Sequence, residues 1–597
     1  MLKKFTARVN GDLVNLALSA QKTLNKKERL KLFTVAGIQF ILSILDLVSL
    51  AAIGVLASIT ISGVARKESS NIASNFLEIT QISNLSLHKQ VVIIGIISAI
   101  LILIRTFVSL ATMSKVFRFL SFSGARLSTE IMRKLIYADN AALKKYTTQE
   151  YVFLSTFGVE SLYLRILAPL VTLISDAVLL LGFATALFVI DPASATATIV
   201  ILLIVNTILN QVQNRKIQHY GEISTNYEIK SREKMIESIK SIREIRTRDR
   251  QEFVIQDYAN KRSLVAGASA FNNWTAYSNK YIIESTLIIG GMAIAAIEFW
   301  LTDAITAIST LAVFLASSMR MAPAALRIQQ SLLQARVCSV PAKQLLELLE
   351  YLDESKILER KINLNPSSVK NPFEPRITIE NLCVNYFDNS NFQIKNLNLT
   401  IESGEFAGII GESGSGKSTL VDAILGNLKL TSGKVEISGA EPSRIFKQFP
   451  GMVSYLPQET FISNGTVKEN LIFGFREDEF STKELKNALE KAEILDFVNS
   501  LPLGLDTILG ENGSILSGGQ KQRIGLARAL ITNPKLIILD EATSALDSET
   551  ESKIAATIQN LGTGITRLVI THRSSTLIGA DRIFEMKSGE IRELFDR

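Results

Sequence analysis

Cysteine and histidine are scarce in this chain. Its 597 residues include two cysteines, Cys338 and Cys383, and three histidines. Two isolated thiols form neither a disulfide framework nor a cysteine-based metal site. Both cysteines fall in segments that we place in the cytosol below, so we expect them to be reduced and structural. With so few histidines, one that ends a strand is informative.

Two further features are missing, and their absence narrows the class of partner. The formal charge is +7, but no basic tract is interleaved with aromatic residues, so nucleic-acid binding is not favoured. The first 30 residues are basic, and Asp12 and Asn15 interrupt their apolar patch. This argues against a cleaved signal peptide and favours a cytosolic or interfacial helix. We therefore read the positive charge as the bias of cytosolic loops in a membrane protein.

Long apolar runs, by contrast, are abundant before residue 340. Hydrophobic residues make up 47% of the chain. Each run is close to the roughly 20 residues that cross a bilayer as a helix. The six candidate spans are Leu32–Ile61, Val91–Ser114, Leu162–Ile190, Ala193–Leu209, Tyr281–Trp300 and Ala304–Ala322. The connections Lys115–Ser161 and Asn210–Lys280 are rich in Lys and Arg, which predicts that they and both termini are cytosolic.

The loops between the spans suggest contact surfaces. The long cytosolic connections predict helices that continue beyond the membrane. Their tips, Tyr146–Ser155 and Ile239–Gln251, are candidates for contact with a soluble part, with solvated helix surface as the alternative. In the external loop Arg66–Gln90, the segment Ile72–Ile79 has helix-like apolar spacing. It is either a short surface helix or an ordered loop.

Charged residues inside the spans are candidates for cargo contact, because charges in lipid are costly and usually face a bundle interior or a cavity. Counting about 1.5 Å per residue places Arg105 and Arg320 in the inner half of the membrane, where two arginines suit an anionic head group. Internal pairing, such as Arg105 with Glu284, or snorkelling to the interface is the alternative. The full set comprises Asp46, Arg105, Asp176 and Glu284 within the spans, and Arg320 and Arg327 at the inner end of the sixth.

The composition changes after the last span. Residues 341–375 become charged and then loop-like, with three prolines near their end, and predict a linker. Alternating strand and helix patterns run from Arg376 onward. We therefore expect a membrane domain at residues 1–340, a linker at 341–375 and an α/β domain at 376–597.

The stretch Gly411–Thr419, GESGSGKST, indicates a phosphate site in the α/β domain. It follows the apolar strand pattern Phe406–Ile410 and precedes a helical pattern at Leu420–Leu425. Its glycines allow a tight turn whose N–H groups form an anion cradle at a helix N-terminus. In this spacing, Lys417 reaches the β- and γ-phosphates and the Ser418 hydroxyl holds Mg²⁺.

Polar and aromatic residues on neighbouring strands could complete that site. Tyr386, with Phe387 as a second choice, could stack on a base, although a strand aromatic is more often part of the core. Gln458 follows the short strand pattern Ser454–Gln458 and could reach Mg²⁺ or an attacking water. His572 ends the strand pattern Arg567–Ile570 and could hydrogen-bond the γ-phosphate.

Two later motifs add a base and a second anion cradle. The run Leu536–Glu541, LIILDE, is an apolar strand ending in two carboxylates. Asp540 could hold the Mg²⁺ shell, while Glu541 polarises a water against the γ-phosphate. Leu516–Gln520, LSGGQ, precedes a helical run and suits an anion. Because one phosphate loop already fills the site, a second cradle implies a second copy of the chain.

In this order, GESGSGKST, PQ, LSGGQ, LIILDE, SALD and TH resemble an ATP-binding cassette (ABC) domain from Arg376 to the C-terminus. With six preceding spans, the chain resembles a half-transporter of the ABC exporter type. The resemblance implies an α-helical six-span domain followed by an α/β P-loop ATPase, with ATP and Mg²⁺ as cofactors. It implies that Asp547 lies at a dimer interface and that Thr507–Gly513 touches the membrane domain. The implied catalytic residues are Glu541, His572 and Gln458, and the implied metal ligands are Ser418, Gln458 and Asp540. The implied nucleotide contacts are Tyr386, Gly411, Glu412, Ser413, Gly414, Ser415, Gly416, Lys417, Ser418, Thr419, Ser517, Gly518, Gly519 and Gln520.

A closer likeness concerns the cargo. GESGSGKSTLVDAILG and the run MAPAALRI after Arg320 are similar to bacterial lipid-linked oligosaccharide flippases. We therefore expect an ATP-driven flippase in the inner (plasma) membrane, a homodimer with its ATPase domains in the cytoplasm. Its load would be a lipid-linked oligosaccharide or a related glycolipid. A peptide or drug exporter is the alternative within transport. An ATP-gated channel or a non-transporting membrane regulator is the alternative from another class.

Overall fold

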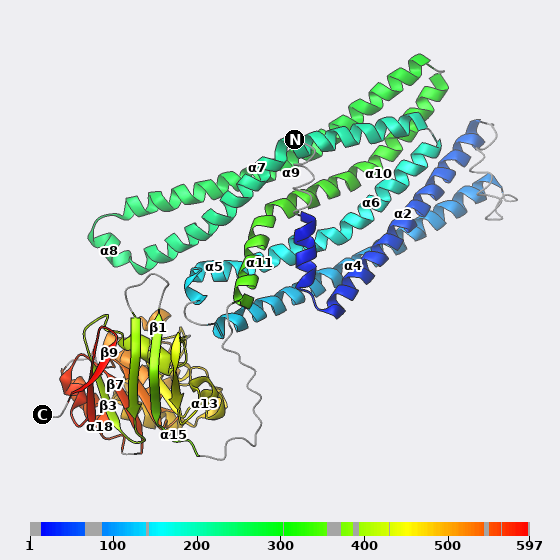
Figure 1. Ribbon diagram of the computed structural model, residues 1–597. Coiled ribbons are helices and arrows are strands. Elements are labelled where there is room, and N and C mark those ends of the chain that lie inside the picture. Colours follow the sequence, from blue (N-terminus) through cyan, green and yellow to red (C-terminus); the bar gives the residue numbers. More distant parts are fainter. Residues whose placement is uncertain are drawn as a thin grey trace. The chain divides into compact units, whose positions relative to one another are not determined.

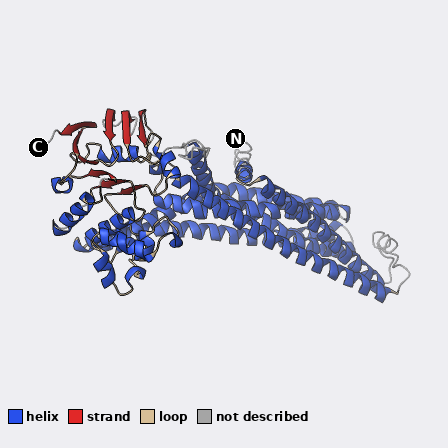
Figure 2. Cartoon of the chain, turned by 90° about the horizontal axis from the view of Figure 1, so that it is seen from below, coloured by secondary structure: helices blue, strands red, loops and turns tan. Residues whose placement is uncertain are grey.

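The computed structural model describes residues 13–65, 86–138, 142–190, 192–301, 304–354, 372–385, 393–428, 430–542, 548–562 and 564–594. The chain divides into two compact units. Unit 1 comprises Met1–Ile136 with Lys144–Ser355, and unit 2 comprises Tyr137–Leu143 with Lys356–Arg597. The strands belong to unit 2, whereas the described part of unit 1 is helical (Figure 2).

Unit 1 consists of long helices, several of them far longer than a membrane is thick (Figure 1). Its elements are α2 (Lys26–Ala65), α4 (Leu87–Ile136), α5 (Thr148–Phe153), η2 (Leu154–Gly158), η3 (Ser161–Leu167), α6 (Ala168–Ile190), α7 (Pro192–Lys240), α8 (Ile242–Thr247), α9 (Gln251–Leu301), α10 (Ala304–Val337) and α11 (Ser339–Glu354). The short η1 (Ala142–Lys144) includes residues of both units. The elements η2 and η3 are π-helical.

Each of the six apolar runs lies within helical backbone of this unit. Among the described residues, three helical segments are long and apolar enough to cross a membrane: Lys26–Ser49, His88–Ile136 and Thr148–Thr185. The helices α4, α7 and α9 continue well beyond the candidate spans that they contain, as we expected. That these continuations are cytosolic stays a prediction. The proposed external helix at Ile72–Ile79 lies outside the described residues.

Four of the charged residues of the spans form two ion pairs in the structure. Arg105 Nη2 lies 2.7 Å from Asp46 Oδ2, joining α4 to α2. Arg327 Nη2 lies 2.6 Å from Asp176 Oδ1, joining α10 to α6. Of the alternatives for Arg105, internal pairing is therefore the one observed, but the expected partner, Glu284, was wrong. Asp46 is closer to the guanidinium because α2 packs along α4.

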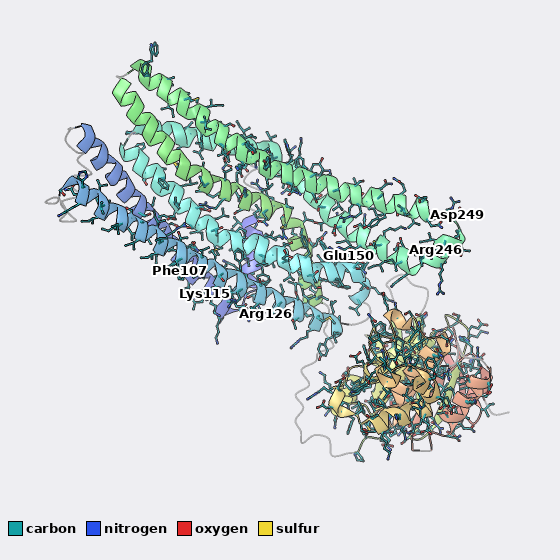
Figure 3. All side chains as sticks on the ribbon, turned by 180° about the vertical axis from the view of Figure 1, so that it is seen from behind. Phe107, Lys115, Arg126, Glu150, Arg246 and Asp249 are labelled. Atoms are coloured by element: carbon teal, nitrogen blue, oxygen red, sulfur yellow. The ribbon has the colours of Figure 1, made fainter. Side chains whose placement is uncertain are left out.

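The helices α7 and α9 form a long antiparallel pair, and α8 joins them at the tip (Figure 1). Their contacts keep one register along the pair: Gln213 with Asn279, Tyr220 with Phe271, Glu228 with Arg262, and Lys234 with Asp257. Arg246 and Asp249 lie at this tip, and Glu150 lies on α5 (Figure 3). Figure 3 also follows Phe107, Lys115 and Arg126 along α4, where Arg126 Nη2 donates to Glu28 Oε2 over 2.8 Å. That the two tips contact a soluble part stays a prediction.

The helix α11 falls within the segment that we expected to be linker. Its Leu345, Leu348 and Leu352 are fully buried, and they belong to the same apolar cluster as Leu162 of η3. The regular spacing of these leucines gives the helix one apolar face, which packs on unit 1. Residues 355–371 lie outside the described part, so the boundaries of the linker stay a prediction.

Unit 2 has two sheets with helices around them. The first has the strand order β2-β1-β4 and is antiparallel. The second has the order β5-β6-β7-β3-β8-β9, with parallel neighbours except at β9. The strands are β1 (Ile377–Asn385), β2 (Gln393–Ile401), β3 (Phe406–Ile410), β4 (Ser432–Ile437), β5 (Val453–Leu456), β6 (Leu536–Asp540), β7 (Thr566–Ile570), β8 (Arg582–Lys587) and β9 (Glu590–Leu594). The main helices are α12 (Lys417–Ile424), α13 (Pro442–Gln448), α14 (Val467–Leu471), α15 (Thr482–Lys491), α16 (Leu495–Ser500), α17 (Gly518–Leu530) and α18 (Ser548–Gln559).

This topology brings the sequence motifs together. The parallel strands β5, β6, β7 and β3 are consecutive neighbours, so their carboxyl ends meet along one edge of the sheet. In open α/β sheets ligands bind at that edge. The predicted strand Phe406–Ile410 coincides with β3, whereas the helix expected at Leu420–Leu425 begins earlier, at Lys417.

Candidate functional site

The loop between β3 and α12 forms the centre of the site. Gly414 and Gly416 have φ values of 82° and 113°, which favour glycine. A Cβ on Gly411 would lie 2.3 Å from the carbonyl oxygen of Met586, so the loop passes too close to β8 for any side chain there. Gly416 is the N-cap of α12, and the first helical N–H groups therefore face the loop. The backbone of Gly411–Thr419 thus has the geometry of an anion cradle.

Lys417 is held inside this loop. Its Nζ donates to the carbonyl oxygens of Gly411 over 2.7 Å and Glu412 over 2.9 Å. Burial lowers the pKa of Lys417, while the carboxylates of Glu541 and Asp540 oppose that effect. The Ser415 hydroxyl is buried without a hydrogen-bond partner among the described atoms. The loop therefore holds a buried cation and a spare polar group, as a phosphate site requires.

Two acidic residues leave the end of β6 in different directions. Asp540 is the last residue of the strand and is buried. Burial and the neighbouring Glu541 carboxylate raise the pKa of Asp540, and the Lys417 ammonium partly opposes this. Glu541 has a left-handed φ of 49°, and its N–H donates to the Ile570 carbonyl over 2.8 Å. Strand geometry ends at Asp540, and the left-handed backbone of Glu541 sends its carboxylate out of the strand's alternation.

The Glu541 carboxylate joins three segments. Gln458 Nε2 donates to Glu541 Oε2 over 2.6 Å. His572 Nε2 lies 3.0 Å from Glu541 Oε1. The three side chains that we expected to be catalytic, from β6 and from the segments after β5 and β7, are thus in direct contact. A carboxylate held in this way, close to a phosphate cradle, has the geometry expected of a general base.

An ion pair with a buried carboxylate fixes the segment after His572. Arg573 Nη1 is paired with Glu551 Oε2 of α18, and the Ser575 hydroxyl donates to Glu551 Oε1 over 2.5 Å. Glu551 is buried. These contacts hold the backbone that carries His572, so Glu551 acts on the site through Arg573.

The residues expected to hold Mg²⁺ supply oxygen donors. They are the exposed hydroxyl of Ser418, the amide of Gln458 and the buried carboxylate of Asp540. Mg²⁺ prefers such donors and is usually bound through one or two carboxylates together with substrate phosphates. The donor set therefore fits Mg²⁺. The described residues contain no cluster of three or more His, Cys, Asp or Glu side chains that would hold a metal by itself.

The LSGGQ segment forms the start of α17. The Ser517 hydroxyl accepts from the Gln520 N–H over 3.2 Å, and the Gln520 side-chain oxygen accepts from the Ser517 N–H over 2.8 Å. This reciprocal cap satisfies two donors of the helix start. Among the described contacts, neither side chain bonds to Gly411–Thr419. The structure therefore places the second cradle apart from the first within one chain.

Some predicted site residues cannot be located. Tyr386, its alternative Phe387, and Asp547 lie outside the described residues, as does the side chain of Arg320. The roles assigned to all the site residues stay predictions.

Two contributors to the site were not found from the sequence. Tyr455 of β5 hydrogen-bonds Asp540, and burial together with that carboxylate raises the pKa of Tyr455. Its place three residues before Gln458 was the available signal. Glu551 had no signal, because its role depends on α18 packing against the segment after His572.

Comparisons with known proteins concern the family and the fold. Residues 394–544 match the protein family described as ABC transporter. A solved structure described as a bacterial Atm1-family ABC exporter with ATP bound has a TM-score of 0.72 to this chain, at 19% identity, and the match covers 95% of each chain. The chain has the fold of an ABC exporter. This confirms the expected fold class, a helical membrane domain followed by an α/β ABC ATPase domain.

Proteins related to this chain in sequence have names that point to different functions. The ABC-type transporter MDR1 of Aureobasidium melanogenum is 40% identical over 201 residues, which is 34% of this chain and 15% of that protein. The ATP-dependent lipid A-core flippase of Ralstonia nicotianae is 38% identical over 229 residues, which is 37% of this chain and 39% of that protein. The matched segments thus span well under half the length of these relatives.

Proposed function

We propose that the chain is an ATP-driven exporter that moves an amphipathic load outward from the inner leaflet. The observation that carries this proposal is the Glu541 carboxylate, held between Gln458 and His572 at the same sheet edge as the phosphate loop. Because the same chain carries a unit with membrane-spanning helices, ATP hydrolysis would drive a process in the membrane.

Binding of ATP would replace the hydrogen bonds that Lys417 makes within the phosphate loop. The phosphates would replace the carbonyls of Gly411 and Glu412 as partners of the Lys417 ammonium, while the cradle N–H groups bind their oxygens. Mg²⁺ bound by Ser418, Gln458 and Asp540 would neutralise phosphate charge. Glu541 would accept a proton from the attacking water, and His572 would donate to the γ-phosphate.

A second copy of the chain completes the site in this proposal. Ser517 and Gln520 cap their own helix and have no described bond to the phosphate loop, so a γ-phosphate contact from this segment would come from a partner. Both Glu541 and the LSGGQ segment match the ABC pattern without change, which favours a homodimer with two working sites. Closure of the two ATPase units would move the membrane helices through the tips Tyr146–Ser155 and Ile239–Gln251. We place the protein in the inner (plasma) membrane, with the ATPase units in the cytoplasm.

For the cargo, we propose a lipid-linked oligosaccharide or a related glycolipid. The likeness to a lipid A-core flippase supports a lipid, and the likeness to proteins named ABC multidrug transporters keeps a drug or peptide load as the second candidate. The Arg327 guanidinium is half exposed beside the buried Asp176, so it remains available to an anionic group. The pairing of Arg105 with Asp46 weakens its role as a cargo contact.

ATPase measurements in proteoliposomes test this function. We expect stimulation by lipid-linked sugars to exceed stimulation by drugs or peptides, together with ATP-dependent movement of the lipid between leaflets. Stimulation by drugs or peptides alone would favour the second candidate. ATP-dependent ion conductance, or binding without net movement, would favour an ATP-gated channel or a regulator instead.

A further inference from the structure

The helix α9 carries an exposed aromatic stripe. Trp274, Tyr277 and Tyr281 follow one another at spacings of three and four residues, so they lie along one face of the helix. Their exposed fractions are 62%, 63% and 48%. The opposite face is buried, since Thr275 is fully buried and Asn279 is 5% exposed. The stripe therefore points away from the helices that pack against α9.

The position of this stripe along the helix corresponds to a membrane boundary. Trp300, at the other end of α9, is 86% exposed. It lies about 28 Å from Tyr281 along the axis, at about 1.5 Å per residue, which is close to the hydrocarbon thickness of about 30 Å. Trp274 lies roughly 10 Å further toward the cytosolic end. If Trp300 marks the outer boundary, the stripe extends from the inner boundary through the headgroup layer.

The geometry within the stripe leaves polar tips available. The Tyr277 and Tyr281 rings are 5.0 Å apart, and their hydroxyl oxygens are separated by 3.0 Å. One hydroxyl hydrogen serves this bond, so the other can donate to a lipid phosphate or ester oxygen. Tyrosine and tryptophan are enriched at this depth because each has an apolar body and a polar tip.

One lysine lies beside the stripe, and a second lies at the same level on the neighbouring helix α7. Lys280 Nζ lies 5.7 Å from the centre of the Tyr281 ring. Lys216 on α7 is one helical turn from Tyr220, whose ring lies 4.4 Å from that of Phe271 on α9. Both lysines are exposed, and no ion pair within the described part of the chain involves either of them. Glu284 lies one helical turn beyond Lys280 and Tyr281 on α9, so the two lysines leave a net positive charge of one beside the stripe.

We propose that Trp274, Tyr277, Tyr281, Lys216 and Lys280 form a binding surface for the headgroups of anionic phospholipids in the inner leaflet. The rings set the depth of the surface, and the two ammonium groups select a negative headgroup. The proposal rests on the membrane placement of unit 1 and is independent of the cargo. An alternative occupant, a second copy of the chain covering the stripe, is an outcome of the test.

The two tryptophans of the chain make a direct test possible. Trp300→Phe leaves Trp274 as the sole indole reporter in the full-length protein. This variant is reconstituted in vesicles of phosphatidylcholine containing 30% of either brominated phosphatidylglycerol or equally brominated phosphatidylcholine. We expect Trp274 fluorescence to be quenched at least twofold more by the anionic lipid. Bromine atoms near the headgroup should quench more than bromine atoms deep in the chains.

Variants that remove charge test the preference for anionic lipid separately from the depth of the stripe in the membrane. In the Trp300→Phe background, Lys216→Gln with Lys280→Gln should abolish the preference for the anionic lipid and retain quenching by both lipids. The matched control, Lys483→Gln with Lys486→Gln on the exposed face of α15, removes the same charge and should keep the preference. Equal quenching by both lipids in the parent would overturn the selectivity. Absence of quenching by either lipid would show that protein covers the stripe and would overturn the proposal.

Discussion

His572 Nε2 and Glu541 Oε1 are separated by 3.0 Å. With Gln458 on the other carboxylate oxygen, both oxygens of Glu541 are engaged while Lys417 bonds to its own loop. Glu541, Gln458, His572 and Lys417 are thus each engaged by a neighbouring protein group. ATP and an attacking water would have to replace these hydrogen bonds, which lie at the carboxyl edge of one sheet.

Glu541→Gln should abolish turnover while leaving ATP binding intact. The substitution keeps the shape of the side chain and removes the proton acceptor, and general-base catalysis typically contributes about 100-fold or more. We expect phosphate release to fall by at least that factor and the closed, ATP-bound dimer to accumulate.

Glu549→Gln is a matched control for that experiment. Glu549 is an exposed residue of α18 that forms a surface ion pair with Lys553. Its substitution should leave phosphate release within about twofold, because surface ion pairs contribute little. Normal phosphate release by the Glu541→Gln variant would contradict the role of Glu541 as the general base.

Lys417→Ala should weaken ATP binding by tenfold or more, which corresponds to at least about 1.4 kcal/mol. The variant loses the ammonium that reaches the phosphates. Thermal unfolding measured with and without Mg-ATP checks this, since a ligand that binds only the native state raises the melting temperature. We expect the nucleotide-dependent rise to be clearly smaller in the variant than in the parent at the same ATP concentration. A full rise in the variant would contradict the assignment of Lys417 to the phosphates.

Gly411→Ala and Gly414→Ala should differ in their effect on stability. A methyl group at position 411 would overlap the Met586 carbonyl, so β8 or the loop must move, at about 1–3 kcal/mol or more. At position 414 nothing lies within 4 Å, and the expected cost is the left-handed backbone alone, about 1 kcal/mol. Melting temperatures of the two variants without nucleotide test this order. Equal losses would mean that the loop moves freely away from β8.

The Asp46–Arg105 pair should be tested by a double-mutant cycle. Removing one partner leaves the other charge uncompensated in a partly buried site, so Asp46→Asn and Arg105→Gln should each destabilise the protein, by about 1–3 kcal/mol. The double variant should be more stable than the sum of the single effects implies. Additive losses would show that the pair contributes no coupling.

The same variants address cargo contact. If Arg105 serves the fold through Asp46, transport by the double variant should recover along with its stability. If a stable double variant still lacks ATPase stimulation by lipid-linked sugars, that result would indicate that Arg105 contacts the cargo.

The local sequence was sufficient for the elements whose pattern is dictated by short-range chemistry. The strand at Phe406–Ile410, the glycine loop after it and the helix of the signature segment follow from apolar spacing, backbone freedom and capping. The order of motifs also predicted that Gln458, Glu541 and His572 belong to one site. The partner of Arg105 was mispredicted, because span boundaries counted from sequence do not reveal which helices pack together.

By itself, the sequence determined the class of this protein, since a run long enough to cross a bilayer and a glycine loop that cradles phosphate are properties of a few consecutive residues. Only the tertiary structure decided which distant side chains meet. It joined Glu541 to His572, Glu551 to Arg573 and Asp46 to Arg105, and it turned the aromatic stripe of α9 outward. Such contacts depend on strand order and helix packing, which no local pattern encodes.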